Sequence, residues 1–315
     1  MAKVSDHIYW RELKGLRMAL SVGNIAFGLQ EFAKNFAMGF APFRFIRLKS
    51  NRIRTSAAPD KSLLGRYAYW LPELILKYIG SVEGKDILEI GPGDHIGTGL
   101  AFIALGARSY TTLDRFTRNY SNQLARGWYA LVQEEFSATF SRPWPGGLSH
   151  DSFPQSCDKV KCLRMSIEEL GDCSQYDIVC SYAVAEHVSS VPRFAEANRR
   201  LLRRDGRALH AIDFSGHGWE RNGDEMLFTR IPEWAWSAMG SNRGYPNRIP
   251  FPDFKLILES AGLDVQAVNQ KPFKTNDNIQ EATFLLARNE VGGDTQLERM
   301  SPVTLSSQLL EKVTQ

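Results

Sequence analysis

A short run of glycines and acids near residue 90 is the part of this sequence best suited to hold a ligand. The run reads DILEIGPGDHIG over residues 86–97. Glycines that directly follow an apolar segment let the backbone approach a ligand closely, and nucleotides are commonly bound in this way. Several kinds of nucleotide use such loops, so the neighbouring residues must decide which ligand fits.

The loop differs from the two best-known nucleotide-binding patterns. A dinucleotide fingerprint would place its third glycine at position 96, but that residue is Ile96 and the glycine comes one residue later, at Gly97. The loop contains no lysine, which excludes a phosphate-binding P-loop. Glu89 lies just before the glycines, where its charge would repel a pyrophosphate and would suit a ligand that carries an ammonium group.

Two further positions fit a nucleoside. Asp114 ends the next apolar segment, where an acid can accept hydrogen bonds from ribose hydroxyls. Ser166 and Ile167 follow a third apolar segment and offer a hydroxyl and a backbone amide to the edge of an adenine. Each signal is weak alone, but their order and spacing together are specific.

The elements that must position these residues alternate between strand and helix from residue 84 onward. We expect strands at 86–90, 109–114, 160–165, 176–184 and 207–214, and helices at 97–107, 118–139, 191–206 and 252–263. The segments 264–270 and 281–289 are predicted to close the sheet as a hairpin-like pair. This pattern predicts an α/β fold with a parallel sheet that is covered by helices on both faces.

The domain organisation follows from the changes in pattern. Residues 1–60 are predicted to form a helical extension, 61–289 the main domain and 290–315 a polar tail, with a helix at 62–80 in which Pro72 marks a boundary or a kink. The segments 140–158 and 215–251 exceed ordinary connection lengths, so we expect them to be substrate-side insertions. Trp219, Trp234 and Trp236 of the second insertion fit either stacking on an acceptor or plain core packing.

The charge is concentrated at the front of the chain, because residues 1–54 hold ten Lys and Arg against three acids. A solvated basic face is the plainer explanation, and contact with anionic lipid, nucleic acid or an acidic substrate is the alternative. A stripe of phenylalanines in this region is expected to pack on the main domain, with a membrane-surface helix as the alternative; its members are Phe27, Phe32, Phe36, Phe40 and Phe43. The four cysteines form no C-x-x-C pair, which argues against zinc, and no secretion signal is recognisable, so a reduced, cytoplasmic and at most membrane-peripheral protein is expected.

At these residues the sequence resembles the class I S-adenosylmethionine-dependent methyltransferases, over roughly residues 84–215. The E-x-G-x-G segment with Gly97 is similar to the first motif of that family, Asp114 to its ribose-binding acid, and YDIVCSYAVAEHV (176–188) to its fourth motif. The resemblance implies a Rossmann-like, doubly wound, seven-stranded sheet with the last strand antiparallel, and S-adenosylmethionine as cofactor. The cofactor contacts that it implies are Glu89, Gly91, Gly93, Asp94, Gly97, Asp114, Arg115, Ser166, Ile167 and Ser181.

The resemblance also suggests where the chemistry lies. Histidine is the side chain best suited to take a proton from a hydroxyl acceptor near neutral pH. His187 is the first candidate base because it follows the fourth strand beside the methyl position, and His217 with Asp213 is the second. Relatives that bind a metal carry an acid where this chain has Ala183, so no metal is expected.

The AEHV segment (185–188) is similar to small-molecule O-methyltransferases, and the pattern over 211–254 resembles methyltransferases encoded with bacterial surface-polysaccharide enzymes. These resemblances imply O-methylation of a small molecule or of a saccharide or lipid-linked acceptor. The alternatives are a nicotinamide-dependent oxidoreductase, against which Glu89 and Ile96 argue, and a catalytically silent module that keeps the fold. Nucleic acid is not an expected partner, because SYAV (181–184) replaces the N-P-P-Y type of motif found in amino-directed relatives.

Overall fold

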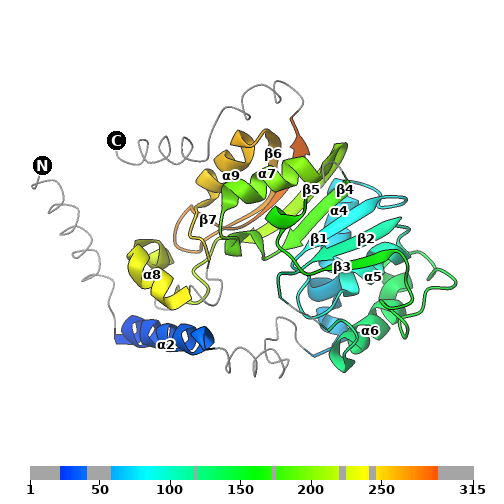
Figure 1. Ribbon diagram of the computed structural model, residues 1–315, viewed down its shortest axis with the longest axis horizontal. Helices are drawn as coiled ribbons and strands as arrows, with labels where there is room; N and C mark the ends of the chain where they lie inside the picture. Colours follow the sequence, from blue (N-terminus) through cyan, green and yellow to red (C-terminus); the bar gives the residue numbers. More distant parts are fainter. Residues whose placement is uncertain are drawn as a thin grey trace, which may run out of the picture.

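The computed structural model describes residues 22–40, 58–116, 119–171, 175–219, 225–240 and 246–289 of the 315-residue chain. Figure 1 shows a central sheet between helices, with α2 and α8 side by side at one edge of the molecule. Among the described residues, no helix combines the length and the hydrophobicity that crossing a membrane requires.

The sheet has seven strands in the order β3-β2-β1-β4-β5-β7-β6. The first five are parallel, and β7 runs antiparallel to both β5 and β6, which confirms the predicted fold. The order reverses between β1 and β4, where α/β proteins bind their ligands. The bounds are β1 Asp86–Ile90, β2 Ser109–Leu113, β3 Val160–Leu163, β4 Tyr176–Tyr182, β5 Leu202–Asp213, β6 Leu263–Pro272 and β7 Ile279–Arg288.

Helices cover both faces of the sheet. One buried cluster joins α4 (Trp70–Tyr78), α5 (Gly97–Ala104) and α6 (Gln123–Phe140) to the strands. The other cluster joins α7 (Val191–Leu201) and α9 (Phe251–Ser260) to the opposite face. The remaining helices are α2 Val22–Gly39, η1 Lys61–Leu63, η2 Gly65–Tyr69, η3 Ile167–Glu169, η4 Ala185–His187, η6 Leu227–Arg230 and α8 Glu233–Gly240.

The helix predicted at 62–80 consists of three successive segments of different helix type. A 3-10 turn at 61–63 is followed by a π-helix at Gly65–Tyr69 and then by α4. Pro72 lies in the first turn of α4, where its missing N–H is least costly. The irregularity is therefore the π-helix before the proline, and π-helices occur frequently at functional sites.

The two predicted insertions lie at opposite ends of the sheet. The segment 140–158 joins α6 to β3, so it enters at the amino end of a strand, and its Phe153 is buried in the core beside Tyr129. Its assignment as a substrate-side insertion is therefore wrong. The segment 215–251 leaves the carboxyl end of β5, on the side where parallel sheets bind ligands.

The phenylalanine stripe of α2 mostly faces solvent instead of the main domain. Phe27 packs edge-on against Trp219 at 5.0 Å between ring centroids, but Phe32, Phe36 and Phe40 are between 47% and 59% exposed. Phe43 and the segments 1–21, 41–57 and 290–315 lie outside the described residues. The expected packing therefore holds for Phe27 and is wrong for the next three rings.

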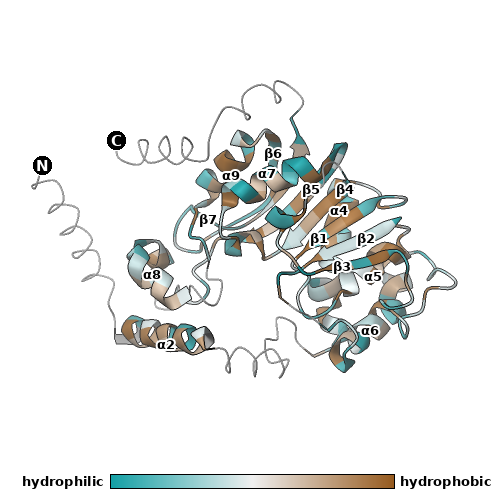
Figure 2. Ribbon diagram, viewed as in Figure 1, coloured by the Kyte–Doolittle hydropathy of each residue, from teal (hydrophilic) through white to brown (hydrophobic). Residues whose placement is uncertain are grey.

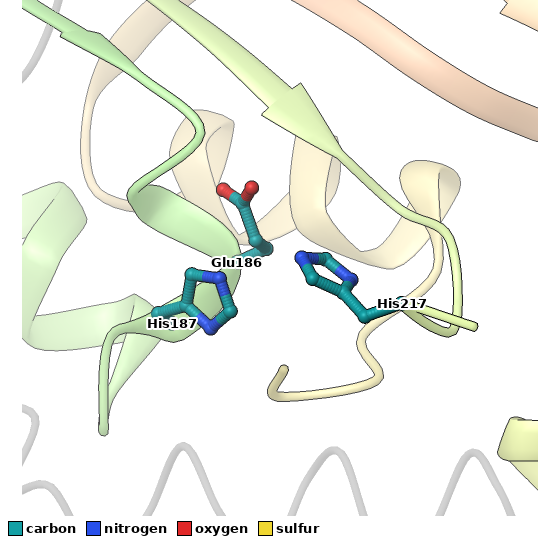
Figure 3. A group of neighbouring side chains, drawn as sticks. All are labelled: Glu186, His187 and His217. Carbon is teal, nitrogen blue, oxygen red and sulfur yellow. The ribbon is translucent and has the colours of Figure 1, made fainter. Parts of the chain in front are cut away.

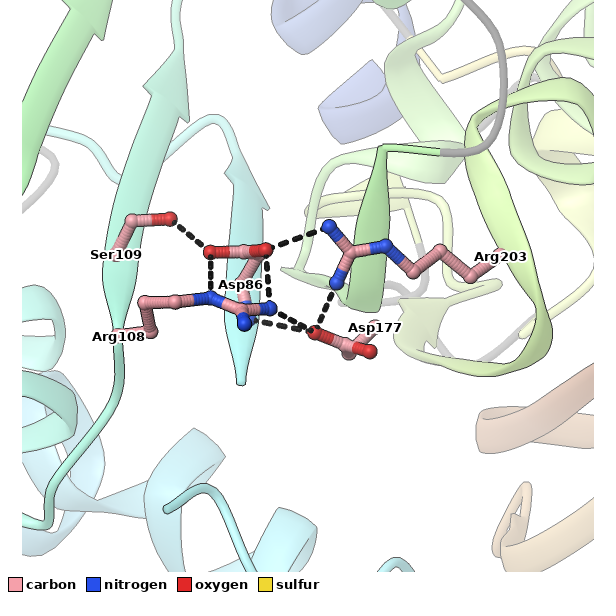
Figure 4. A network of polar contacts seen from close by, with 5 residues as sticks. All are labelled: Asp86, Arg108, Ser109, Asp177 and Arg203. Carbon is pink, nitrogen blue, oxygen red and sulfur yellow. Dashed lines mark hydrogen bonds and ion pairs between the residues drawn. The ribbon is translucent and has the colours of Figure 1, made fainter. Parts of the chain in front are cut away.

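An ionic cluster ties the amino ends of β1 and β4 to the start of β5 (Figure 4). Arg203 donates to Asp86 at 2.7 Å and to Asp177 at 2.5 Å, while Arg108 donates to Asp86 through two nitrogens at 2.9 and 2.6 Å. Arg108 is the main reason why the pKa of Asp86 lies well below its usual range. The predicted helix over 191–206 ends early, at Leu201, and β5 begins with an irregular register that brings Arg203 into this cluster.

We expect Arg203→Ala to lower the free energy of unfolding by about 1–2 kcal/mol, because it leaves two partly buried carboxylates with one cation while solvent screens part of the loss. Urea unfolding measures this change, and Arg207→Ala on the same strand is the control, because Arg207 is exposed and its hydrogen bond is to Gly206. Equal stability of the Arg203→Ala and Arg207→Ala variants would contradict the role of the cluster.

The stabilisation from Asp86 is present above the ordinary aspartate pKa and is lost as the pH falls below it.

Candidate active site

A cavity of about 1150 Å³ opens at the carboxyl ends of β1, β2, β4 and β5. This volume exceeds the ~300–1,000 Å³ usual for one small ligand, so it has room for a cofactor together with an acceptor. Nine of the predicted site residues line it: Glu89, Gly91, Gly93, Asp114, Arg115, Ser166, Ile167, His187 and Asp213.

The glycine loop has a backbone that only glycine adopts easily. Gly91 has φ +67° and Gly93 has φ +82°, and a Cβ on Gly91 would lie 2.6 Å from a methyl group of Val184. The Gly91 N–H donates to the carbonyl of Leu113 at 2.7 Å, which ties the loop to the end of β2. The loop therefore forms a cradle with bare backbone towards the cavity, as close approach of a nucleoside cofactor requires.

The glycine that lets α5 pack closely on β2 is Gly99 and not Gly97. Gly97 begins α5 and does not line the cavity. A Cβ on Gly99 would lie 2.3 Å from the ring of Tyr110, so a side chain there would push α5 away from β2. Sequence reasoning missed this position because it sought the third glycine of a dinucleotide pattern.

Glu89 forms the buried acidic floor of the cavity. It is 5% exposed and accepts a short hydrogen bond from the Tyr110 hydroxyl. Burial raises the pKa of Glu89 to about 7, although the Tyr110 hydrogen bond opposes the rise. The residue therefore exchanges its proton near neutral pH and can become an anion when a cationic group binds beside it.

Asp114 and Ser166 lie at the ends of β2 and β3. Asp114 lines the cavity, and its Oδ1 accepts the N–H of Phe116 at 2.8 Å, which fixes the turn after the strand. The Ser166 N–H donates to the Glu169 carboxylate at 2.7 Å, so this amide is already used and is not available to an adenine.

Three of the predicted cofactor contacts lie off the cavity wall: Asp94, Gly97 and Ser181. Ser181 is fully buried, and its hydroxyl lies 2.8 Å from Nδ1 of His210 inside the protein. Side chains alternate along a strand, so Ser181 faces the core while the next residue, Tyr182, lines the cavity. The assignment of Ser181 to the cofactor is therefore not supported by its position.

Part of the wall comes from a helical segment that the sequence did not single out. Arg66 and Tyr67 of the π-helix and Trp70 of α4 line the cavity, and Trp70 packs on Tyr182 at 4.7 Å between ring centroids. The aromatic run RYAYW (66–70) was the available signal, but the π-helix that turns these side chains towards the cavity has no sequence signature.

The two predicted base candidates lie side by side (Figure 3). His187 comes from η4 after β4, His217 comes from the loop after β5, and their rings meet edge to face at 5.0 Å. His217 Nδ1 lies 3.0 Å from the carbonyl of Ser215, so in the neutral ring this nitrogen carries the proton and Nε2 is the acceptor. Asp213 lines the cavity and accepts the N–H of Ser215 at 2.8 Å, which shapes the same turn.

The backbone around these histidines is strained. Ala183 has φ +52° and His217 has φ +53°, a region that L-residues rarely adopt. Asn247 fixes η4 from the insertion, because its N–H donates to the Glu186 carbonyl at 2.7 Å and its Nδ2 to the Ala185 carbonyl at 3.1 Å. Backbone strain of the kind seen at Ala183 and His217 concentrates at functional sites, which supports a functional assignment for the loops that carry His187 and His217.

Glu186 lies beside the two histidines (Figure 3) and is 2% exposed. Burial raises the pKa of its carboxyl to about 8, and the nearby Asp213 adds to the rise, so Glu186 is mostly protonated at neutral pH. One donor atom from each of Glu186, His187 and His217 lies within 4.8 Å of the others, a spacing that could accommodate a metal ion. The absence of a metal thus stays a prediction that rests on Ala183.

Two other histidines are buried and make contacts inside the protein. His95 accepts the Gly97 N–H at 3.1 Å at the start of α5 and stacks on Trp128, and burial lowers its pKa to about 3. His210 contacts Ser181 and Asn198, and burial lowers its pKa to about 3 as well. His150 bonds to Gln133 away from the cavity, and His7 lies outside the described residues.

Residues 63–268 match the family model of a methyltransferase domain. The chain belongs to this family. It is an S-adenosylmethionine-dependent methyltransferase, and neither the nicotinamide-dependent oxidoreductase nor the silent module considered above. The bare glycine cradle, the cavity-lining Asp114 and the buried Glu89 fit this cofactor.

Several solved structures are similar to this chain at low sequence identity. The YcgJ protein of Bacillus subtilis is 12% identical with a TM-score of 0.45, and the match covers 69% of this chain and 97% of that one. The 1,6-didemethyltoxoflavin-N1-methyltransferase of Burkholderia thailandensis is 13% identical with a TM-score of 0.44, covering 83% and 90%. The geranyl diphosphate C-methyltransferase of Streptomyces coelicolor is 9% identical with a TM-score of 0.44, covering 70% and 78%.

No curated protein matches the sequence.

We expect Asp114→Ala to weaken the binding of S-adenosylhomocysteine by about 1–3 kcal/mol, roughly 5- to 150-fold, because ribose hydroxyls lose their acceptor. Isothermal titration measures the change, and Asp151→Ala, with a side chain that is 83% exposed and off the cavity wall, is the matched control. Unchanged affinity in Asp114→Ala would refute the ribose assignment.

Cofactor binding should release a proton from Glu89. The free carboxyl has a pKa of about 7, so below that pH it is mostly protonated, and an ammonium group beside it favours the anion. Affinity for S-adenosylhomocysteine should therefore rise as the pH rises through 7, and titrations near pH 6.5 in buffers of different ionisation enthalpy should show proton release. Glu89→Gln should abolish the release, and its persistence in that variant would assign the proton to another group.

Proposed function

We propose that this methyltransferase acts on a hydroxyl oxygen of a small-molecule or saccharide acceptor, lipid-linked acceptors included, and that His187 takes up the hydroxyl proton. The observation that carries the proposal is the position of His187. It lines the cavity just beyond the end of β4, with its ring against His217. A neutral imidazole at a cavity wall is the group best suited to this proton transfer near neutral pH.

When bound, S-adenosylmethionine supplies a methyl group on a positively charged sulfur that is open to in-line attack. Transfer would form the bond from the acceptor oxygen to that methyl carbon as the carbon–sulfur bond breaks, with the electron pair of the broken bond left on the sulfur. The hydroxyl proton passes to the imidazole of His187. The contribution of the protein is therefore alignment of the two reactants and removal of this proton.

The neighbours of His187 support this role. Glu186 is mostly protonated at neutral pH because of burial, so it places no full negative charge beside the ring of His187. Asn247 holds the backbone of η4, and Asp213 holds the turn that carries His217. Asp213, first considered with the catalytic pair, is better described as a positioning residue for His217.

We expect His187→Ala to lower turnover by about 10²–10⁴-fold, the usual contribution of a general base, with the affinity for S-adenosylhomocysteine unchanged. The assay is transfer of a tritium-labelled methyl group to an acceptor found by screening glycans, quinones and polyketides with the unchanged protein. His150→Ala is the control, because this histidine bonds to Gln133 away from the cavity.

Three results would contradict the proposal. Wild-type turnover in His187→Ala would move the base elsewhere. Loss of turnover on treatment with a chelator, restored by a divalent metal, would replace the base by a metal held by Glu186, His187 and His217. A product methylated on nitrogen or carbon, identified by nuclear magnetic resonance, would refute the choice of acceptor atom.

A further inference from the structure

The helix α2 buries polar residues and exposes apolar ones, the reverse of an ordinary amphipathic helix. Asn24, Glu31 and Asn35 are only 7%, 5% and 3% exposed. Large apolar side chains follow a separate face of the same helix: Ile25 (44% exposed), Leu29 (65%), Phe32 (47%), Phe36 (59%) and Phe40 (49%).

Contacts with the insertion 215–251 hold the helix in this orientation. Asn35 donates from Nδ2 to the carbonyl of Ala238 in α8 at 2.8 Å, and Phe27 packs on Trp219. A Cβ on Gly28 would lie 3.3 Å from the Trp219 ring, so the helix lies close against the indole. In Figure 2 brown, hydrophobic residues recur along α2 at the edge of the molecule.

The exposed side chains form one continuous stripe. Phe32 stacks on Phe36 at 6.4 Å between ring centroids, and Phe36 meets Phe40 edge to face at 5.0 Å. Apolar side chains scattered singly over a surface need no explanation, but a contiguous apolar stripe marks an interaction site.

The charges beside the stripe identify the kind of surface that it fits. The acid of α2, Glu31, is buried and paired with Lys34 at 2.6 Å, so the exposed apolar face carries no acid. The sequence that follows, residues 41–54, holds five Lys and Arg and no acid, with Phe43, Phe45, Ile46, Leu48 and Ile53 between them. An apolar helix face that is followed in the sequence by clustered cations suits the interface of an anionic bilayer, which takes apolar side chains below its charged headgroups.

We propose that α2 docks on an anionic membrane surface through Phe32, Phe36 and Phe40. The occupant is a bilayer that contains negatively charged lipids, and its charge complements the cations of residues 41–54. Phe27 of α2 packs on Trp219, which is two residues beyond His217 in the sequence. Docking of α2 therefore brings the His187 side of the cavity, where the acceptor is proposed to bind, towards the membrane. Only this last step rests on the proposed function, and it favours a lipid-linked acceptor.

The test is co-sedimentation of the full chain with vesicles of phosphatidylcholine alone and of an equal mixture with phosphatidylglycerol. The protein should bind the anionic vesicles much more tightly, and added salt should weaken the binding. The double variant Phe32→Ser with Phe36→Ser should lower the affinity at least ~10-fold, because two rings no longer leave water. The control is Leu256→Ser on α9, since this side chain is 47% exposed, as Phe32 is, and should bind like the unchanged protein.

Titration with S-adenosylhomocysteine should give the same affinity for all three proteins, which shows that a loss of vesicle binding is not a loss of fold or of the cofactor site. Equal binding to neutral and anionic vesicles, or unchanged binding by the double variant, would overturn the proposal. So would light scattering that shows a dimer which the double variant converts to a monomer, with no vesicle binding by either, because the stripe would then be an interface between copies of the chain.

Discussion

The contact between Glu89 and Tyr110 is the interaction on which the cofactor side of the site depends. The Tyr110 hydroxyl donates to Glu89 at the floor of the cavity, and the Tyr110 ring lies where a side chain on Gly99 would be. The absence of a side chain at Gly99 therefore lets α5 lie close to β2 over the ring. The same ring holds the acid beneath the glycine cradle, so sheet packing and the electrostatics of the cavity are set by one buried pair.

The two ends of the sheet have separate tasks. At the amino ends, Arg203 and Arg108 bind Asp86 and Asp177 and fasten the strands together. At the carboxyl ends, Ala183 and His217 instead have positive φ angles, and burial keeps the Glu186 carboxyl mostly protonated at neutral pH. The ionic cluster thus lies at the end of the sheet away from the cavity, and the strained backbone lies at the candidate site, where such strain commonly occurs.

Local patterns predicted the strands and the topology, because strand–helix alternation depends on neighbouring residues. They also selected residues of which most line the cavity, and the cofactor contacts of those residues stay a prediction. Two assignments do not fit the structure. Ser181 was assigned to the cofactor although the alternation of its strand turns it to the core, and 140–158 was assigned to the substrate side although it enters at the amino end of β3. The orientation of α2 was not predictable, because Asn35 and Gly28 meet the distant residues Ala238 and Trp219.

The measurement that tests this account most directly is a crystal structure of the chain with S-adenosylhomocysteine. The account predicts that the ligand lies in the cavity with its ribose hydroxyls on Asp114, its amino group near Glu89 and its sulfur facing the side of the cavity that His187 lines. A ligand bound elsewhere, or one in this cavity that touches neither Asp114 nor Glu89, would contradict it.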